Sequence, residues 1–188
     1  MLRTVTVFCG SRCGNDPRHA MTARELGGEL ARRGVTLLWG AGRVGLMGEV
    51  ADAAMAAGGR VSGVIPEFLR TEELLHPRIR PADLVVTATL FERKRRLIEP
   101  ADAFVVLPGG LGTFDELFEV LTLRQLRRLP RQPPCGVLNV DGYFDPLLAQ
   151  LERAVAAGFC DRGHVAALRV ATDVPALLDR LAMEAGGG

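Results

Sequence analysis

The chain has 188 residues, 48% of them apolar and 24% charged, with 23 basic against 22 acidic side chains and a formal net charge of +1. This balance excludes a disordered chain, and near-neutrality argues against a dedicated nucleic-acid-binding protein, whose affinity would depend on neutralising phosphates. No apolar run approaches the roughly 18 residues of a spanning helix, the start lacks a signal peptide, and the four scattered cysteines indicate reduced thiols, so we expect a cytoplasmic protein.

Short apolar, β-branched runs alternate with longer helical patterns along the chain. The predicted strands are Thr4–Cys9, Val35–Trp39, Val61–Ile65, Leu84–Ala88, Ala103–Leu107, Gly136–Val140 and Leu168–Ala171. The predicted helices lie between them, at about Pro17–Arg33, Gly45–Ala57, Leu90–Glu99, Thr113–Arg128, Phe144–Ala157 and Val174–Ala185. This alternation predicts a single α/β domain over residues 1–188, with a doubly wound, mainly parallel sheet of about seven strands and helices on both faces.

Three of the strand-to-helix loops are rich in glycine: CGSRCG after the first strand, GAGRVGLMG after the second and PGGLGTFDE after the fifth. In doubly wound sheets, ligands bind beyond the carboxyl ends of the strands, near the point where the strand order reverses. We therefore expect the functional site to lie among these loops.

The second loop, Gly40–Gly45, matches the G-x-G-x-x-G fingerprint of dinucleotide-binding proteins. Glu67 follows the next strand, where a ribose-binding acid would stand. The motif comes after the second strand rather than the first, however, which favours a tight turn with close helix–sheet packing. A nicotinamide or flavin cofactor, and with it a dehydrogenase, is therefore the less favoured interpretation.

The third loop, Pro108–Thr113, is a more specific signal for a ligand. Its closely spaced glycines let backbone N–H groups approach an oxyanion. The helix that follows adds roughly half a positive charge at its N-terminus. Together these features predict a phosphate site that needs no lysine in the loop, and the absence of G-x-x-x-x-G-K distinguishes it from a P-loop.

Glu116 has two interpretations. Thr113-Phe114-Asp115-Glu116 matches a capping box, in which the glutamate turns back to the Thr113 N–H and stabilises the helix by about 1 kcal/mol. Alternatively, Glu116 faces the cleft beside an anionic ligand, and a cation must then share the site.

The predicted helix within Leu90–Ala101 provides such a cation. At about 100° per residue its apolar side chains form one stripe, with Lys94, the only lysine of the chain, at the centre and Arg93 on the flank. An unpaired lysine on a core-facing stripe is costly. Lys94 therefore either extends outward along its stem or meets anions in the cleft, and we favour the cleft for both basic residues.

The run LFERKRRLIEPADAFVVLPGGLGTFDELFEVLT resembles the hallmark of the LONELY GUY (LOG) family, Rossmann-like phosphoribohydrolases whose relatives were long labelled "possible lysine decarboxylase". The resemblance rests on the Arg93-Lys94 pair and on the P-G-G-x-G-T-x-x-E element from Pro108 to Glu116. The segments VFCGSRCG, GAGRVGLMGEVADAA, GVIP and GVLNVDGYFDPLL are also similar, so the resemblance covers about residues 4 to 160.

The resemblance implies hydrolysis of the N-glycosidic bond of a nucleoside 5′-monophosphate of the cytokinin type, giving free base and ribose 5-phosphate without a cofactor or metal. It implies that Arg93 and Glu116 are the catalytic pair. The implied substrate-binding residues are Glu73, Lys94, Gly109, Gly110, Leu111, Gly112, Thr113, Phe114, Asp115 and Thr122. Family members are typically homodimers with active sites near the subunit interface, and neither nucleic acid nor a membrane is an expected partner.

Several positions depart from the family pattern. Ala41 stands within the usual G-G-G, Leu90-Phe91-Glu92 replaces M-H-x, Asp115 replaces the first glutamate of E-E, and Thr122-Leu123-Arg124-Gln125 replaces T-W-A-Q. These departures leave the preferred base open among adenine, isopentenyladenine and others. Two further arginines, Arg124 and Arg127, either line the cleft or face water.

Two rival functions remain. A carrier of a nucleotide or of molybdenum cofactor would keep the glycine loop but would need neither Glu116 nor Arg93. A pyridoxal-phosphate lysine decarboxylase would need a Schiff-base lysine, and Lys94 is the only candidate.

Overall fold

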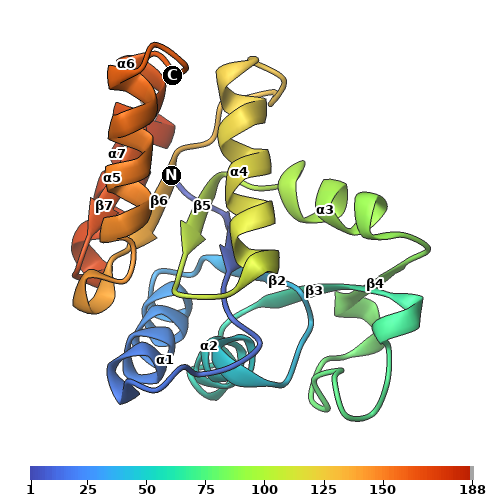
Figure 1. The fold of residues 1–188 in the computed structure, drawn as a ribbon. Helices are drawn as coiled ribbons and strands as arrows, with labels where there is room; N and C mark the ends of the chain where they lie inside the picture. Colours follow the sequence, from blue (N-terminus) through green and yellow to red (C-terminus); the bar gives the residue numbers. More distant parts are fainter. Residues whose placement is uncertain (187–188) are drawn as a thin grey trace.

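The computed structural model describes residues 1–186 and contains a seven-stranded parallel sheet in the order β4-β3-β2-β1-β5-β6-β7 (Figure 1). The strands are β1 Thr4–Phe8, β2 Thr36–Trp39, β3 Val61–Pro66, β4 Leu84–Thr87, β5 Ala103–Val106, β6 Cys135–Leu138 and β7 Leu168–Ala171. The helices are α1 Pro17–Arg32, α2 Gly45–Ala56, α3 Leu90–Ile98, α4 Leu111–Gln125, α5 Asp145–Ala156, α6 Arg162–Ala166 and α7 Val174–Gly186, with short 3-10 turns at Glu67–Leu69, Pro81–Asp83 and Val140–Gly142. Within the described residues, no helix combines the length and the apolarity needed to cross a membrane.

This arrangement confirms the predicted doubly wound α/β fold, and every predicted strand is present within two residues of its expected ends. The main difference concerns α4, which begins at Leu111 rather than Thr113 and ends at Gln125 rather than Arg128. Arg127 adopts a left-handed backbone (φ 53°), which ends the helix earlier than its apolar pattern suggests. The five-residue helix α6 was not predicted, because one and a half turns carry too little periodicity to read.

The helices bury the sheet on both faces. One hydrophobic cluster joins the sheet to α1, α2 and α7, and α1 packs side by side with α2 (Figure 1). A second cluster joins the opposite face to α3, α4 and α5. Strand β5 is buried along its whole length, as its continuous apolar run AFVV predicts for a central strand covered on both sides.

The strand order reverses between β1 and β5, which pair in parallel from Val5 opposite Ala103 to Phe8 opposite Val106. The loops that leave these two strands are therefore neighbours, and the Gly10 N–H donates to the Pro108 carbonyl over 3.0 Å. These are the first and third glycine-rich loops of the sequence. The fold thus places them together at the edge where doubly wound proteins bind ligands.

The apolar stripe predicted for α3 is only half correct. Leu97 and Ile98 are buried in the core, but Leu90 is 48% exposed and Phe91 is 81% exposed. α3 follows β4, the edge strand, and lies at that end of the sheet (Figure 1). Because no further strand lies there among the described residues, the apolar side chains of this first turn remain uncovered within one subunit.

Candidate active site

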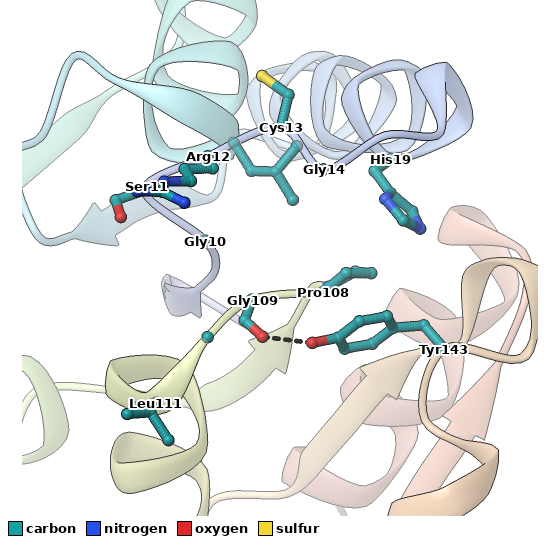
Figure 2. Close-up of a pocket in the computed structure, with 12 residues that line it drawn as sticks. Gly10, Ser11, Arg12, Cys13, Gly14, His19, Pro108, Gly109, Leu111 and Tyr143 are labelled. Carbon is teal, nitrogen blue, oxygen red and sulfur yellow. Dashed lines mark hydrogen bonds between the residues drawn. The ribbon is translucent and has the colours of Figure 1, made fainter.

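Two cavities that share part of their walls open at the switch point. The first, of about 570 Å³, lies between the loops after β1 and β5, with His19 and Tyr143 in its wall (Figure 2). The second, of about 310 Å³, contains Arg93 and Glu116. The residues that line both cavities are Ser11, Gly110 and Leu111. The site is therefore built around the start of α4, with the Arg93–Glu116 pair on one side of it.

The start of α4 offers backbone donors. Gly110 occupies the N-cap position in an extended conformation, and no side chain within residues 1–186 caps this helix end. The first N–H groups of a helix lack intrahelical acceptors and carry a partial positive charge, so they bind anions readily. This geometry supports the predicted oxyanion-binding role of the loop from Gly109 to Thr113.

Gly109 lies where a side chain cannot be accommodated. A Cβ atom built on Gly109 would lie 2.1 Å from the Thr113 hydroxyl oxygen and 2.8 Å from the Gly10 nitrogen. The glycine therefore permits the close approach of the two loops that form the switch-point site. A Cβ atom built on the neighbouring Gly110, by contrast, would have no other atom within 4 Å.

The capping-box interpretation of Glu116 is wrong. Because α4 begins two residues earlier than predicted, Thr113 lies inside its first turn rather than at the cap. The Glu116 carboxylate instead accepts a hydrogen bond from Arg93 of α3, with 3.1 Å between Nη1 and Oε1. The alternative, in which Glu116 faces the cleft and shares it with a cation, matches the structure.

Arg93 and Glu116 form a largely buried ion pair. Glu116 is 7% exposed, and the Arg93 side chain is 17% exposed. The loop after β2 supports the guanidinium, because a Cβ atom on Gly40 would lie only 2.3 Å from Arg93 Nη2. Arg93 Nε is buried and has no hydrogen-bond acceptor among the described residues. The Arg93 side chain as a whole lines the second cavity together with Glu116.

Burial dominates the electrostatics of Glu116. Desolvation raises the pKa of this carboxyl from 4.5 to about 7, and the charge of Asp115 adds to the increase. The charges of Arg93 and Lys94 and the Arg93 hydrogen bond act in the opposite direction but do not cancel the effect of burial. Glu116 can therefore gain or lose a proton near neutral pH, as acid–base groups at active sites commonly do.

Lys94 does not enter the second cavity. Its ammonium lies 2.6 Å from a Glu119 oxygen and 3.1 Å from an Asp115 oxygen, and 5.7 Å above the ring of Phe91. Burial lowers the pKa of Lys94, but hydrogen bonds to Glu119 and Asp115 and their charges raise it overall. Of the two predicted cleft cations, the structure brings Arg93 to Glu116 and places Lys94 and Asp115 together outside the cavity.

Glu73 and Thr122 also lie apart from the pair. Glu73 is exposed in the segment between β3 and β4, which contributes Leu69 to the second cavity instead. Thr122 is exposed on α4, six positions after Glu116 and so roughly 9 Å farther along the helix axis. Their contacts with substrate remain predictions that require a molecule extending out of the cavity.

The dinucleotide interpretation of Gly40–Gly45 does not fit the structure. The loop follows β2 rather than β1, and two of its glycines pack closely on protein: Gly45 on the backbone of Ser11 and Arg12, and Gly42 on Met47. Glu67 is exposed and accepts hydrogen bonds from Arg70. These glycines therefore serve the close packing that the alternative interpretation proposed.

Several residues that line the site were not identified from the sequence. They include Ser11, His19, Met47, Leu69 and Tyr143. Ser11, Met47 and Tyr143 lie in the family-like segments VFCGSRCG, GAGRVGLMGEVADAA and GVLNVDGYFDPLL, so the resemblance could have pointed to them, whereas His19 and Leu69 carried no such signal. The open question about Arg124 and Arg127 is also settled: both line a separate cavity of about 290 Å³ at the C-terminal end of α4.

The fold and the site together define a Rossmann-like α/β protein with a glycine-rich, uncapped helix start at its switch point and a buried arginine–glutamate pair beside it. The family model described as "Possible lysine decarboxylase" matches residues 47–181 of the chain. The chain belongs to this family, the LOG family.

Curated relatives extend the match over nearly the whole chain. "Probable cytokinin riboside 5'-monophosphate phosphoribohydrolase LOGL9" of Oryza sativa subsp. japonica is 43% identical over 179 residues, which cover 95% of this chain and 77% of that protein. "Cytokinin riboside 5'-monophosphate phosphoribohydrolase LOG2" of Arabidopsis thaliana is 38% identical over 179 residues, covering 95% and 82% of the two chains.

Solved structures share the fold at lower identity. The molybdenum cofactor carrier protein of Chlamydomonas reinhardtii superimposes with a TM-score of 0.72 over 99% of each chain, at 21% identity. The molybdenum cofactor binding protein of Rippkaea orientalis gives a TM-score of 0.71 over 97% of each chain, also at 21% identity. This likeness supports the fold alone.

Proposed function

We propose that this protein hydrolyses the N-glycosidic bond of a cytokinin-type nucleoside 5′-monophosphate, releasing the free base and ribose 5-phosphate. The observation that carries the proposal is the buried Arg93–Glu116 pair beside the uncapped, glycine-rich start of α4. Membership of the LOG family and the curated relatives at about 40% identity support the same activity.

The chemistry begins with charge development on the sugar. As the C1′–N bond breaks, the anomeric carbon becomes positive and the bonding electrons leave with the base. The Glu116 carboxylate stabilises this positive charge and orients the attacking water, whose oxygen forms the new bond to C1′. Arg93 holds Glu116 in place by its hydrogen bond and lines the same cavity, where its positive charge faces the bound substrate. The protons of water end on the ribose hydroxyl and on the departing base.

The glycine loop binds the 5′-phosphate of the substrate, which does not take part in the bond cleavage. Backbone N–H groups of the segment Gly110–Thr113 lie at the positive end of α4 and suit a dianionic phosphate. Binding energy from this remote group can orient the ribose over Glu116. Nucleoside monophosphates should therefore be much better substrates than free nucleosides.

We infer a cytoplasmic homodimer of a single-domain chain. Exposed apolar side chains gather on the edge strand β4 and the first turn of α3, namely Val85, Val86, Leu90 and Phe91. Exposed apolar side chains at a sheet edge are a feature of subunit interfaces. The free cysteines are compatible with a reducing compartment.

The lysine decarboxylase alternative requires a neutral amine that attacks a cofactor aldehyde. Lys94 pairs with two carboxylates, and its pKa is raised, so the neutral form is disfavoured. The geometry of the only lysine thus opposes the chemistry that the family's older description suggests.

Base release across a panel of nucleotides tests the proposal. Purified protein is incubated with adenosine and isopentenyladenosine and with their 5′-mono-, di- and triphosphates, and free base is quantified by chromatography. We expect release from at least one monophosphate, with much less from the free nucleosides. Tight binding of a nucleotide with no base released from any of them would instead favour the carrier function.

A further inference from the structure

The only tyrosine of the chain contacts the glycine loop directly. The Tyr143 hydroxyl donates a hydrogen bond to the Gly109 carbonyl in the first cavity (Figure 2). Its ring stacks on Phe114 in the first turn of α4, with the ring centroids 6.4 Å apart and the planes 5° apart. Tyr143 thus contacts both the loop and the helix that form the predicted phosphate site.

An unusual turn holds Tyr143 in this position. The two preceding residues, Asp141 and Gly142, both have left-handed backbones, with φ of 54° and 70°. Asn139 fixes the turn from inside, because its amide oxygen accepts from the Phe144 N–H over 2.8 Å and its nitrogen donates to Asp145 over 2.7 Å. A left-handed aspartate persists only where its surroundings determine the conformation. The turn therefore fixes the Tyr143 hydroxyl next to the Gly109 carbonyl.

The hydrogen bond from Tyr143 orients the peptide group between Gly109 and Gly110. Among the described residues every peptide bond is trans, so the Gly109 carbonyl and the Gly110 N–H point in opposite directions. A carbonyl held by Tyr143 in the first cavity directs the Gly110 N–H away from the phenol, and Gly110 also lines the cavity of Arg93 and Glu116. Glycine on both sides makes rotation of this peptide group easy when nothing holds it.

We propose that Tyr143 is a positioning residue that holds the Gly109–Gly110 peptide group in its phosphate-binding orientation and so makes the enzyme select phosphorylated substrates. The inference rests on the proposed function and assigns to the phenol a role in substrate selection rather than in bond cleavage. Tyr143 acts through the backbone, and its hydroxyl does not contact the reacting atoms.

The test compares substrates with and without phosphate. In Tyr143→Phe the ring and its stacking on Phe114 remain, and only the hydroxyl is lost. We expect KM for the nucleoside 5′-monophosphate and Kd for ribose 5-phosphate to rise roughly tenfold, the scale of one hydrogen bond. We expect kcat to stay within about twofold and the slow hydrolysis of the free nucleoside to stay unchanged. A merely structural tyrosine would affect both substrates alike.

Two control variants separate the hydroxyl from the ring. Tyr143→Leu also removes the stacking, and we expect the same loss of phosphate selectivity with an additional fall in Tm. Phe159→Leu changes an aromatic residue that is 88% exposed in the turn after α5, and we expect no change in either quantity. Because Tyr143 is the only tyrosine, 3-fluorotyrosine labelling gives a single ¹⁹F resonance, which should shift on titration with ribose 5-phosphate.

An unchanged ratio of monophosphate to nucleoside activity in Tyr143→Phe would overturn the inference, as would a ¹⁹F resonance that does not respond to ribose 5-phosphate. The proposed function fails in a different way. If the wild-type protein binds ribose 5-phosphate and Tyr143→Phe weakens that binding, but no nucleotide releases base, the positioning role stands and only the hydrolase activity is lost.

Discussion

Arg93 and Glu116, 23 residues apart in the chain, meet with 3.1 Å between Nη1 and Oε1 at the start of α4. They come from different helices, and the helix dipole, the glycine loop and the support of Gly40 all converge on the same place. A carboxylate this deeply buried carries a cost in stability that the fold would avoid if Glu116 served packing alone.

That cost predicts a pH-dependent stability difference between wild type and Glu116→Gln. The folded pKa of Glu116, about 7, lies above its ordinary 4.5, so this group contributes stability that is complete below about pH 4.5 and lost as the pH rises through 7. Glutamine carries no such dependence. Relative to wild type, Glu116→Gln should gain stability between pH 4.5 and 8, by on the order of 3 kcal/mol.

Denaturant unfolding of both proteins across this pH range measures the difference. Glu152→Gln, which changes an exposed glutamate paired with Arg162, should run parallel to wild type. A constant difference between Glu116→Gln and wild type at every pH would show that Glu116 titrates normally.

Removal of Arg93 should change both the rate and its pH dependence. Arg93→Ala removes the positive charge that lowers the pKa of Glu116, so the carboxylate forms only at higher pH. We expect a loss of about 10²-fold in kcat at pH 7, partly recovered at pH 9, with the ascending limb of the profile shifted to higher pH. Arg95→Ala, on an exposed arginine of the same helix, is the matched control and should retain the wild-type profile. If the ascending limb of the Arg93→Ala pH–rate profile lies at the same pH as in wild type, Arg93 does not influence the pKa of Glu116.

Gly109→Ala should impair both folding and phosphate binding. Its Cβ atom would lie 2.1 Å from the Thr113 hydroxyl oxygen and 2.8 Å from the Gly10 nitrogen, so the two loops must separate. We expect a loss of about 1–3 kcal/mol in the free energy of unfolding, together with weaker binding of ribose 5-phosphate. Gly28→Ala, in α1 with nothing within 4 Å, should stabilise the protein by about 0.5–1 kcal/mol instead. If Gly109→Ala binds ribose 5-phosphate with wild-type affinity, the loop containing Gly109 does not form the phosphate site.

A charge on the exposed apolar face should prevent dimer formation. Phe91 is 81% exposed at the start of α3, and burying a carboxylate there against a second subunit is unfavourable. Light scattering coupled to gel filtration should show a wild-type dimer and a Phe91→Asp monomer. Phe159→Asp, at a similarly exposed position in the turn between α5 and α6, should remain a dimer. A dimer that survives Phe91→Asp would place the interface elsewhere.

The fold was accessible from the sequence because its signals are local. Continuous apolar runs such as Ala103–Val106 identify buried parallel strands, and the strand–helix alternation sets the topology. The site was accessible in part. The glycine loop and a shared cleft for Glu116 and a basic residue of the α3 segment follow from the residues themselves, whereas the choice of Arg93 and Glu116 as the catalytic pair followed from the family resemblance.

The remaining features depend on tertiary contacts that a linear pattern does not record. Glu116 matched a capping box because the pattern does not reveal that α4 begins at Leu111. The stripe containing Phe91 looked like core because the sequence does not show that α3 follows an edge strand. Tyr143 reaches Gly109 across 34 positions of sequence through a turn whose geometry depends on Asn139.

The most direct measurement is the rate of base release from the preferred nucleoside 5′-monophosphate by wild type, Glu116→Gln and Glu152→Gln, with circular dichroism as the check on folding. We predict that Glu116→Gln remains folded and binds ribose 5-phosphate but loses about 10²-fold or more in kcat, while Glu152→Gln is unaffected. A folded Glu116→Gln protein that releases base at the wild-type rate would contradict the account.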